Sequence, residues 1–200
     1  MIKIKDIISN FSRLIIIFII FIPDFVLSYN EKSSKTILVT SSTGALGSAI
    51  AKSLANKGYN LILTGRDDSK LNAIKKSLSG EVKVNIIKFD YNDIDQIKLA
   101  ASKIKDKSID GMVIIPPRAN FNTKEIPEQK DWRANFESVF IGPLEFIRLT
   151  TSKIKAPGSI VIISGETSKH YMPSYPNTNV LRLMWSGEVK NLCHQYAISL

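Results

Sequence analysis

The chain contains a single cysteine, Cys193, so it has neither an internal disulfide nor a cysteine-rich metal site. Its two histidines, His170 and His194, have no partner at the spacing of metal ligands. There is no internal repeat and no low-complexity tract. The formal net charge is +9, yet the basic residues form no block and no cluster with aromatic residues. Scattered lysines are typical of a solvated surface, and we expect no nucleic-acid partner.

The chain also lacks the run of about 20 apolar residues that a membrane span needs. The apolar stretch Leu14–Ile22 follows a basic start, stops at Pro23-Asp24 and precedes the small residue Ser28. This order is the pattern of a secretory signal. We therefore expect a signal-like or membrane-anchor segment at 1–28 and a linker at 29–35, in a membrane-anchored or exported protein. An apolar helix packed on a cytoplasmic protein is the alternative.

What the chain does contain is a glycine turn between two apolar runs. The β-branched run Thr36–Thr40 predicts a strand buried on both faces of a parallel sheet. Gly44 and Gly47 follow at once, then apolar residues at helical spacing, and then a second strand at Leu61–Leu63. Such a βαβ unit takes about 30 residues. A glycine turn that opens a helix directs backbone N–H groups at a pyrophosphate, so the stretch favours dinucleotide binding over a merely structural turn.

The residues after the second strand indicate which dinucleotide is bound. An acidic residue at this place holds the ribose 2′-hydroxyl of NAD, whereas an arginine accommodates the 2′-phosphate of NADP. Arg66 therefore favours NADP. Asp67 keeps NAD open, unless it or Asp68 only caps the next helix.

With these motifs, residues 36–200 resemble the short-chain dehydrogenase/reductase family. The family's glycine motif begins with a threonine, matched by Thr40, and TGRDDSKL after the second strand is typical of NADP-preferring members. The resemblance implies an α/β fold with a Rossmann-like, doubly wound parallel sheet in three layers (α/β/α), truncated after the fifth strand and the following helix. It also implies an NAD(P)(H)-dependent oxidoreductase that transfers a hydride to or from a carbonyl, alcohol or enoyl substrate. The implied cofactor-binding residues are Thr40, Ser41, Ser42, Thr43, Gly44, Leu46, Gly47, Arg66 and Asp90.

Further strands are expected at Val82–Phe89, Met112–Ile115 and Ser159–Ile163. The third strand delivers Asp90, which matches the family's adenine-binding acid and could also cap the following helix. After the fourth strand, Pro116-Pro117 replaces the family's Asn-Asn-Ala-Gly segment, and Arg118 comes next, as a surface residue or as a partner of a phosphate or an acidic substrate.

Two long helices are expected, at 131–153 and 179–200, and the resemblance implies that they join two copies into a homo-oligomer. The first carries Asn135 within WxxxNFxxVF, which matches the family's asparagine that holds a water in the proton relay. Gly142-Pro143 should bend or interrupt this helix. Because the chain stops after the second helix, the fifth strand is expected to be an exposed edge that needs cover.

The catalytic residues depart from the family pattern, because Tyr-x-x-x-Lys is absent. In the ordinary register Gly165, Thr178 and Arg182 occupy the serine, tyrosine and lysine positions. The register of divergent enoyl reductases instead selects Ser164, Tyr175 and Arg182. There Ser164 would orient the substrate, Tyr175 would donate the proton, and Arg182 with Asn135 would support it, since a nearby cation favours the phenolate.

Two functions follow from these observations. The first is an NADP-preferring oxidoreductase with altered catalytic residues, acting on a small carbonyl, alcohol or enoyl compound. The second is a catalytically inactive Rossmann module that binds a nucleotide or a protein partner, as a pseudoenzyme or a truncated gene product.

Overall fold

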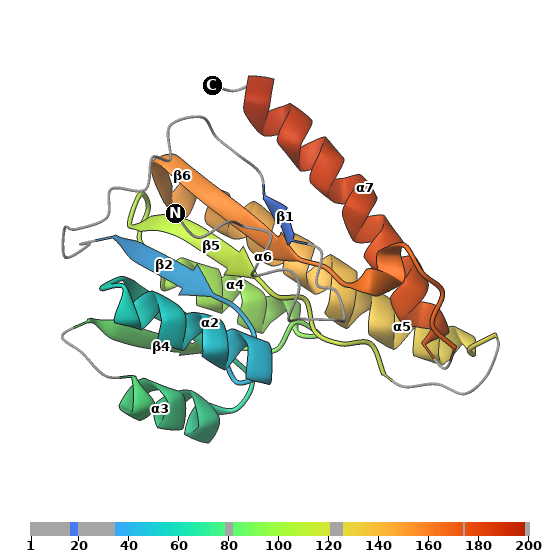
Figure 1. Ribbon diagram of the computed structural model, residues 1–200, viewed down its shortest axis with the longest axis horizontal. Coiled ribbons are helices and arrows are strands. Elements are labelled where there is room, and N and C mark those ends of the chain that lie inside the picture. The colour runs from blue at the N-terminus through green and yellow to red at the C-terminus, as the bar shows by residue number, and fades with distance from the viewer. Residues whose placement is uncertain (1–16, 20–34, 79–81, 121–125, 174, 199–200) are drawn as a thin grey trace, which may run out of the picture.

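A computed structural model describes residues 17–19, 35–78, 82–120, 126–173 and 175–198 (Figure 1). Its sheet has the strand order β1-β6-β5-β2-β3-β4. The strands are β1 (Ile17–Ile19), β2 (Thr36–Val39), β3 (Asn60–Gly65), β4 (Val84–Lys88), β5 (Ile109–Ile114) and β6 (Ile154–Ile163). The helices are α2 (Ala45–Asn56), α3 (Asp68–Ser77), α4 (Ile94–Ser102), α5 (Gln129–Phe136), the π-helical η1 (Glu137–Ile141), α6 (Gly142–Thr150), the 3₁₀ helices η2 (Thr151–Lys153) and η3 (Glu166–Ser168), and α7 (Pro176–Ile198).

The five strands from β2 to β6 are parallel, and the chain winds outward from the middle of the sheet in both directions. It starts at β2, moves to β3 and β4 on one side, and then returns to β5 and β6 on the other. The winding direction therefore changes between β2 and β5. In open α/β sheets, ligands bind at such a switch point, beyond the carboxyl ends of the strands. The predicted doubly wound Rossmann-like sheet is confirmed.

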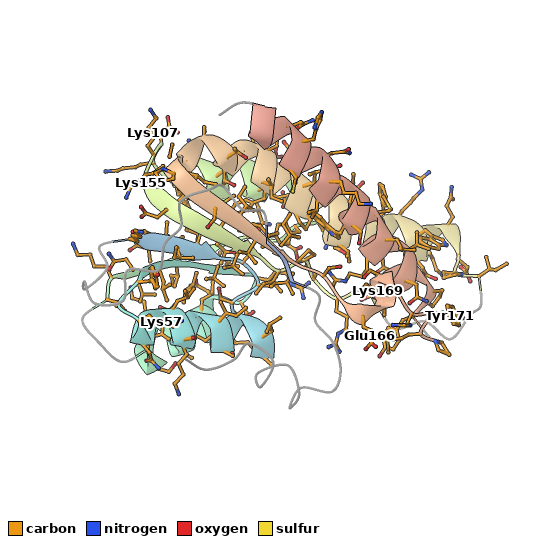
Figure 2. All side chains as sticks on the ribbon, turned by 45° about the horizontal axis from the view of Figure 1, so that its top comes forward. Lys57, Lys107, Lys155, Glu166, Lys169 and Tyr171 are labelled. Atoms are coloured by element: carbon orange, nitrogen blue, oxygen red, sulfur yellow. The ribbon has the colours of Figure 1, made fainter. Side chains whose placement is uncertain are left out.

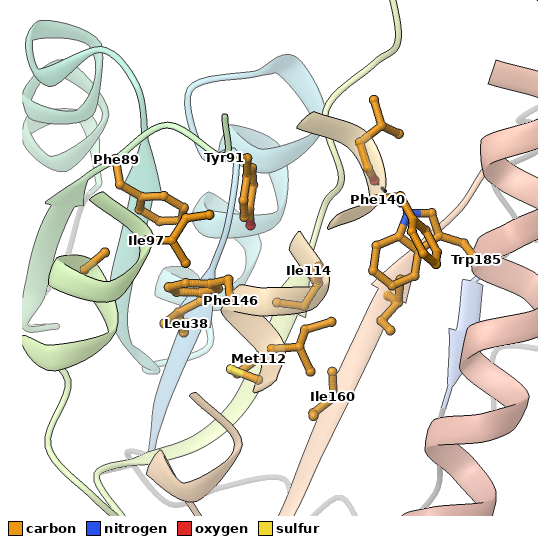
Figure 3. Packing of buried hydrophobic residues seen from close by; sticks show 14 of the residues in the cluster. Leu38, Phe89, Tyr91, Ile97, Met112, Ile114, Phe140, Phe146, Ile160 and Trp185 are labelled. Carbon is orange, nitrogen blue, oxygen red and sulfur yellow. Dashed lines mark hydrogen bonds between the residues drawn. The ribbon is translucent and has the colours of Figure 1, made fainter. Parts of the chain in front are cut away.

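Each face of the sheet carries its own hydrophobic core, which confirms the three-layer arrangement. On one face, α2 and α3 pack on β2 and β3 through residues such as Leu63 and Leu71. On the other face, α4, α6 and α7 cover a larger cluster that includes Phe146 and Trp185, both fully buried (Figure 3). The rings of Phe89 and Phe146 stack with their centroids 4.8 Å apart.

The long helix expected at 131–153 is interrupted, as Gly142-Pro143 predicts. The π-helical turn η1 separates α5 from α6. Because Pro143 has no N–H, it cannot donate the α-helical hydrogen bond to the carbonyl of Val139. That carbonyl instead accepts a hydrogen bond of 2.8 Å from the indole Nε1–H of Trp185 on α7. A Cβ on Gly142 would collide with the backbone carbonyl of Tyr91, so the glycine lets this helix approach the strand-to-helix loop before α4 closely.

The edge of β6 is covered, so the prediction of an exposed edge is wrong. The short strand β1 pairs antiparallel with β6, with Ile17 opposite Ile163 and Ile19 opposite Val161. These residues belong to the apolar run that the sequence indicates as a signal, and a pairing between segments so far apart in sequence has no local signature. The remaining residues of 1–34 lie outside the described part of the chain, so the leader and the linker stay predictions. Within the described residues, no helix has the length and apolar character of a membrane span.

Candidate functional site

Residues that the sequence assigns to cofactor binding fasten the turn after β2, through side chains to Ile115 after β5 and through a backbone N–H to β3. The Thr40 hydroxyl accepts a hydrogen bond of 2.8 Å from the N–H of Ile115, and the Ser41 hydroxyl donates one of 2.7 Å to the carbonyl of Ile115. The Ser42 hydroxyl donates to the carbonyl of Val39, and its N–H donates to that of Thr64. Thr40 and Ser42 are fully buried, so their role is to hold the turn.

Backbone geometry explains the small residues of this turn. Ser41 has a φ of 49°, in the left-handed region that favours glycine, and it stands where the usual fingerprint has its first glycine. Gly47 packs directly on the turn, because a Cβ there would collide with the Ser41 carbonyl oxygen and lie 2.8 Å from Cα of Ser42. Gly44 precedes α2, and its own added Cβ would meet Ser41 only at an ordinary 3.5 Å. Leu46 is half-buried in the first turn of α2.

A cavity of about 350 Å³ lies against this turn, at the carboxyl ends of β2, β3 and β4. Ser41, Thr43 and Gly44 form part of its wall, together with Arg66 and Asp90. The Arg66 guanidinium lies 3.7 Å from the Asp90 carboxylate, and the Arg66 side chain is 72% exposed, so its charge is available at the rim. The structure therefore brings together most of the residues expected to bind the cofactor, from three separate segments.

Two aspartates near this cavity are helix caps. The Asp67 carboxylate accepts from the N–H of Lys70 and caps α3, which is the alternative to NAD binding that the sequence left open. Asp93, not Asp90, caps α4 through the N–H groups of Asp95 and Gln96. The alternative role of Asp90 as a helix cap is therefore wrong, and its carboxylate accepts from the N–H of Asn92 at the cavity wall.

The cavity wall also includes residues that the sequence did not assign to the cofactor. Arg118 and Asn120 line it from the loop after β5, and Ser138 lines it from η1. Asn120 follows the carboxyl end of β5 by a few residues. Open α/β sheets bind ligands at that end, so the position of Asn120 after the strand is the signal in the sequence that indicates it.

The four residues expected to be catalytic do not line this cavity. Ser164 follows β6 and is 5% exposed. Arg182 of α7 lies beside it, because the Arg182 guanidinium reaches the carbonyl of Ile163 at 3.4 Å and its Nε lies 3.9 Å from the point where Gly165 would carry a Cβ. Arg182 thus lies close to Ile163 and Gly165, the residues on either side of Ser164.

The two other residues of this set have different surroundings. Tyr175 is half-buried just before α7, where its N–H donates to the carbonyl of Met172 and its own carbonyl accepts from Asn179. Asn135 is 2% exposed and uses both ends of its amide in the fold. Its Nδ2 donates to the carbonyl of Asp131 at 2.8 Å, and its Oδ1 accepts from the N–H of Asn120 at 2.9 Å. Asn135 thus fixes the loop that lines the cavity.

Electrostatics around Arg182 are unusual for an arginine. Burial, and to a smaller extent repulsion from Arg118, lowers the pKa of Arg182 to about 10. Among the described residues, no carboxylate lies within ion-pair distance of Arg182. Glu166, Lys169 and Tyr171 lie at the end of the molecule opposite Lys57, Lys107 and Lys155 (Figure 2).

Comparison with known proteins gives consistent results. The family model described as short chain dehydrogenase matches residues 35–177. The chain is 36% identical over 78 residues to a very-long-chain 3-oxoacyl-CoA reductase of Kluyveromyces lactis, which covers 38% of this chain and 22% of the relative. It is also 36% identical over 70 residues to a sulfoacetaldehyde reductase of Chromohalobacter salexigens, covering 35% and 28%. The aligned parts make up about a quarter of these relatives.

A solved structure extends the likeness over most of the fold. An NADPH-dependent reductase involved in bacilysin biosynthesis superposes with a TM-score of 0.75 at 21% identity, covering 82% of this chain and 68% of that one.

Proposed function

The chain belongs to the short-chain dehydrogenase family, and from this premise we propose that it is an NADP(H)-dependent oxidoreductase acting on a carbonyl, alcohol or enoyl compound. The single observation that carries the proposal is the cavity that joins the glycine turn to Arg66 and Asp90. The relatives named above support the reaction class, because each is named as a reductase.

The residues around this cavity fit NADP. Gly44 stands at the N-terminus of α2, where backbone N–H groups and the helix dipole favour a pyrophosphate. Because Gly47 has no side chain, α2 packs closely against the turn, and a ligand can reach those N–H groups. Arg66 would hold the 2′-phosphate, and Asp90 would bind the adenine. When bound, NADPH supplies the hydride that is transferred.

The catalytic assignment is part of this proposal. Ser164 orients the reacting oxygen of the substrate, Tyr175 donates the proton, and Arg182 places a cation beside them. Asn135 acts as a positioning residue, because its amide holds the backbone of Asn120 at the cavity wall. The proximity of Arg182 to Ser164 supports this set.

Titration with NADPH and with NADH, followed by protein fluorescence, tests the cofactor. We expect Arg66→Ala to weaken NADPH binding about tenfold, through loss of a charge-assisted hydrogen bond, and to leave NADH binding unchanged. Arg133→Ala is the matched control, since Arg133 is an exposed arginine outside the cavity wall. Equal losses for both cofactors would refute the role of Arg66. Saturable binding without turnover on carbonyl and enoyl substrates would favour the inactive binding module instead.

We also propose that the chain forms a homo-oligomer through α5, α6 and α7. Ile141, at the end of η1 between α5 and α6, and Val180 and Leu183 on α7 are exposed large apolar side chains, which supports contact with a second copy at these helices. Light scattering on Leu183→Glu should show a smaller particle than the unsubstituted chain. Association with a membrane through the N-terminal segment is a separate proposal, tested by fractionating cells and sequencing the N-terminus of the recovered protein.

A further inference from the structure

Unpaired polar groups gather where β6 ends and α7 begins. The hydroxyls of Thr167 on η3 and Thr178 on α7 are enclosed and have no hydrogen-bond partner among the described residues. Thr178 is 9% exposed and stands one helical turn before Arg182, so the two side chains share a face of α7. We call Arg182, Thr167 and Thr178 the Arg182 cluster.

Two members of the cluster, Arg182 and Thr167, lie beside the same point next to Gly165. Arg182 Nε and Thr167 Oγ1 both lie 3.9 Å from the place where Gly165 would carry a Cβ. Apart from Gly165 and its two neighbours in the chain, no other heavy atom of the described residues comes within 4 Å of that place. The hydroxyl of Ser164, the next residue along the chain, is also buried and unpaired. Each enclosed polar group without a partner costs about 1–3 kcal/mol, so several in one place indicate a site whose hydrogen bonds are made to a ligand.

The positive charge of the Arg182 cluster favours a negatively charged ligand. The Arg182 guanidinium has five N–H donors. Among the described residues a single hydrogen bond of 3.4 Å, to the neutral carbonyl of Ile163, uses one of them. Glu166 on the adjoining η3 is not within ion-pair distance. Removing a cation from water without a counter-charge is unfavourable, so the site gains most from a negative group. Arg118, whose charge also acts on Arg182, adds to the positive field.

We propose that the Arg182 cluster binds an oxyanion of the substrate, a carboxylate or a sulfonate, so that this chain acts on small, negatively charged carbonyl or alcohol compounds. The inference rests on the proposed function, because it names the substrate class of that site. Ser164 then meets the reacting oxygen, while the cluster holds the charged end. In this assignment the charge of Arg182 acts on the substrate anion as well as on Ser164 and Tyr175.

The position of the cluster favours a substrate anion over a cofactor phosphate, because the cluster residues are not part of the wall of the cavity at the glycine turn, whereas Arg66 is. A planar guanidinium can contact two oxygens of a carboxylate or a sulfonate, and the unpaired hydroxyls of Thr167 and Thr178 are further donors. The net charge of +9 assists the approach of such a substrate.

The test compares anions with neutral molecules of similar shape. Thermal shift and calorimetric titrations use methanesulfonate against dimethyl sulfone, and acetate against acetamide, at constant ionic strength in chloride. We expect saturable stabilisation by the anions alone. Arg182→Gln should weaken it at least tenfold, whereas Arg133→Gln, with the same charge change at an exposed site, should retain it. An equal response to the neutral molecules, or none to either, would overturn the inference.

A second pair of variants guards against misfolding of Arg182→Gln. Thr167→Val and Thr178→Val remove hydroxyls that have no partner among the described residues, so the unliganded protein should not lose stability. We expect each to lower anion affinity about threefold. Unchanged anion affinity in both would overturn the inference even if Arg182→Gln failed to fold.

Turnover separates this inference from the proposed function. With NADPH, succinic semialdehyde should be reduced with a kcat/KM at least tenfold above that of pentanal, and Arg182→Gln should abolish the difference. Turnover with no preference for the charged aldehyde would overturn the inference and leave the oxidoreductase intact. Anion binding without NADPH binding would refute the oxidoreductase and retain the anion site.

Discussion

Alanine substitution at three glycines tests whether the turn after β2 is held by a backbone contact. At Gly47 the added Cβ would collide with the carbonyl oxygen of Ser41 and lie 2.8 Å from Cα of Ser42. Both neighbours are backbone atoms of the turn, so neither can swing aside as a side chain could. At Gly44 the same Cβ meets only an ordinary contact of 3.5 Å, and at Gly187 on α7 it meets nothing within 4 Å.

These contacts set the expected free energies. Overpacking costs about 1–3 kcal/mol, and alanine in place of glycine in a helix returns about 1 kcal/mol. Gly47→Ala should therefore destabilise by up to about 2 kcal/mol and lower the melting temperature by up to about 8 °C in a chain of this size. Gly187→Ala should instead stabilise by up to about 1 kcal/mol. Gly44→Ala should leave unfolding nearly unchanged and weaken NADPH binding, because Gly44 lines the cavity.

Chemical denaturation and NADPH titration on the three variants measure both quantities. A loss of stability at Gly44 as large as that at Gly47 would show that the turn is sensitive to any side chain. If Gly47→Ala kept both stability and NADPH affinity, the close contact with Ser41 and Ser42 would not be what shapes the turn.

Three further substitutions test other links in the fold. Trp185→Phe removes the donor to the buried Val139 carbonyl and should cost about 1–3 kcal/mol in urea unfolding, whereas no loss would mean that the carbonyl is satisfied otherwise. Asp110→Ala removes an acceptor shared by the N–H of Thr36 and the ammonium of Lys155 and should also cost about 1–3 kcal/mol, with Asp110→Asn recovering part of it. Hydrogen bonds from Gln96 and Asp95 lower the pKa of Asp93, so its stabilising contribution is present above about pH 4 and lost as pH falls through the lowered value. The melting-temperature difference between the unsubstituted chain and Asp93→Asn should therefore shrink on acidification, and a constant difference would contradict the role of its charge.

The central strands of the sheet could be predicted from the sequence because they are buried on both faces. Apolar, β-branched runs gave β2, β3 and β5 to within a few residues. The beginning of β6 was missed, because Pro157-Gly158 reads as a turn, whereas the strand starts at Ile154 and continues through both residues. β1 was missed because its pairing with β6 depends on contacts across most of the chain. Local patterns thus locate a strand and do not determine what lies beside it.

At the cofactor site, the chemistry of each residue was easier to predict than its partners. Arg66 and Asp90 were correctly expected near the glycine turn, because both follow strands whose carboxyl ends meet at one edge of the sheet. Asp67 and Asp90 could each be a ligand-binding acid or a helix cap, because an aspartate after a strand is typical of both. Only the observed hydrogen bonds show that Asp67 caps α3 and that Asp93, rather than Asp90, caps α4.

Hydrogen-bond satisfaction distinguishes residues that the sequence treats alike. Asn135 and Thr178 are both buried polar residues at positions where the family resemblance implies a functional group. The amide of Asn135 is paired at both ends, so its removal would first release the loop at Asn120. The hydroxyl of Thr178 is paired with nothing in the described chain, so its burial costs free energy that the fold does not recover. A buried polar group that the fold needs has hydrogen-bond partners in the fold. A buried polar group that serves a ligand lacks such partners, so Thr178 and Arg182 are the residues at which substrate binding should be tested first.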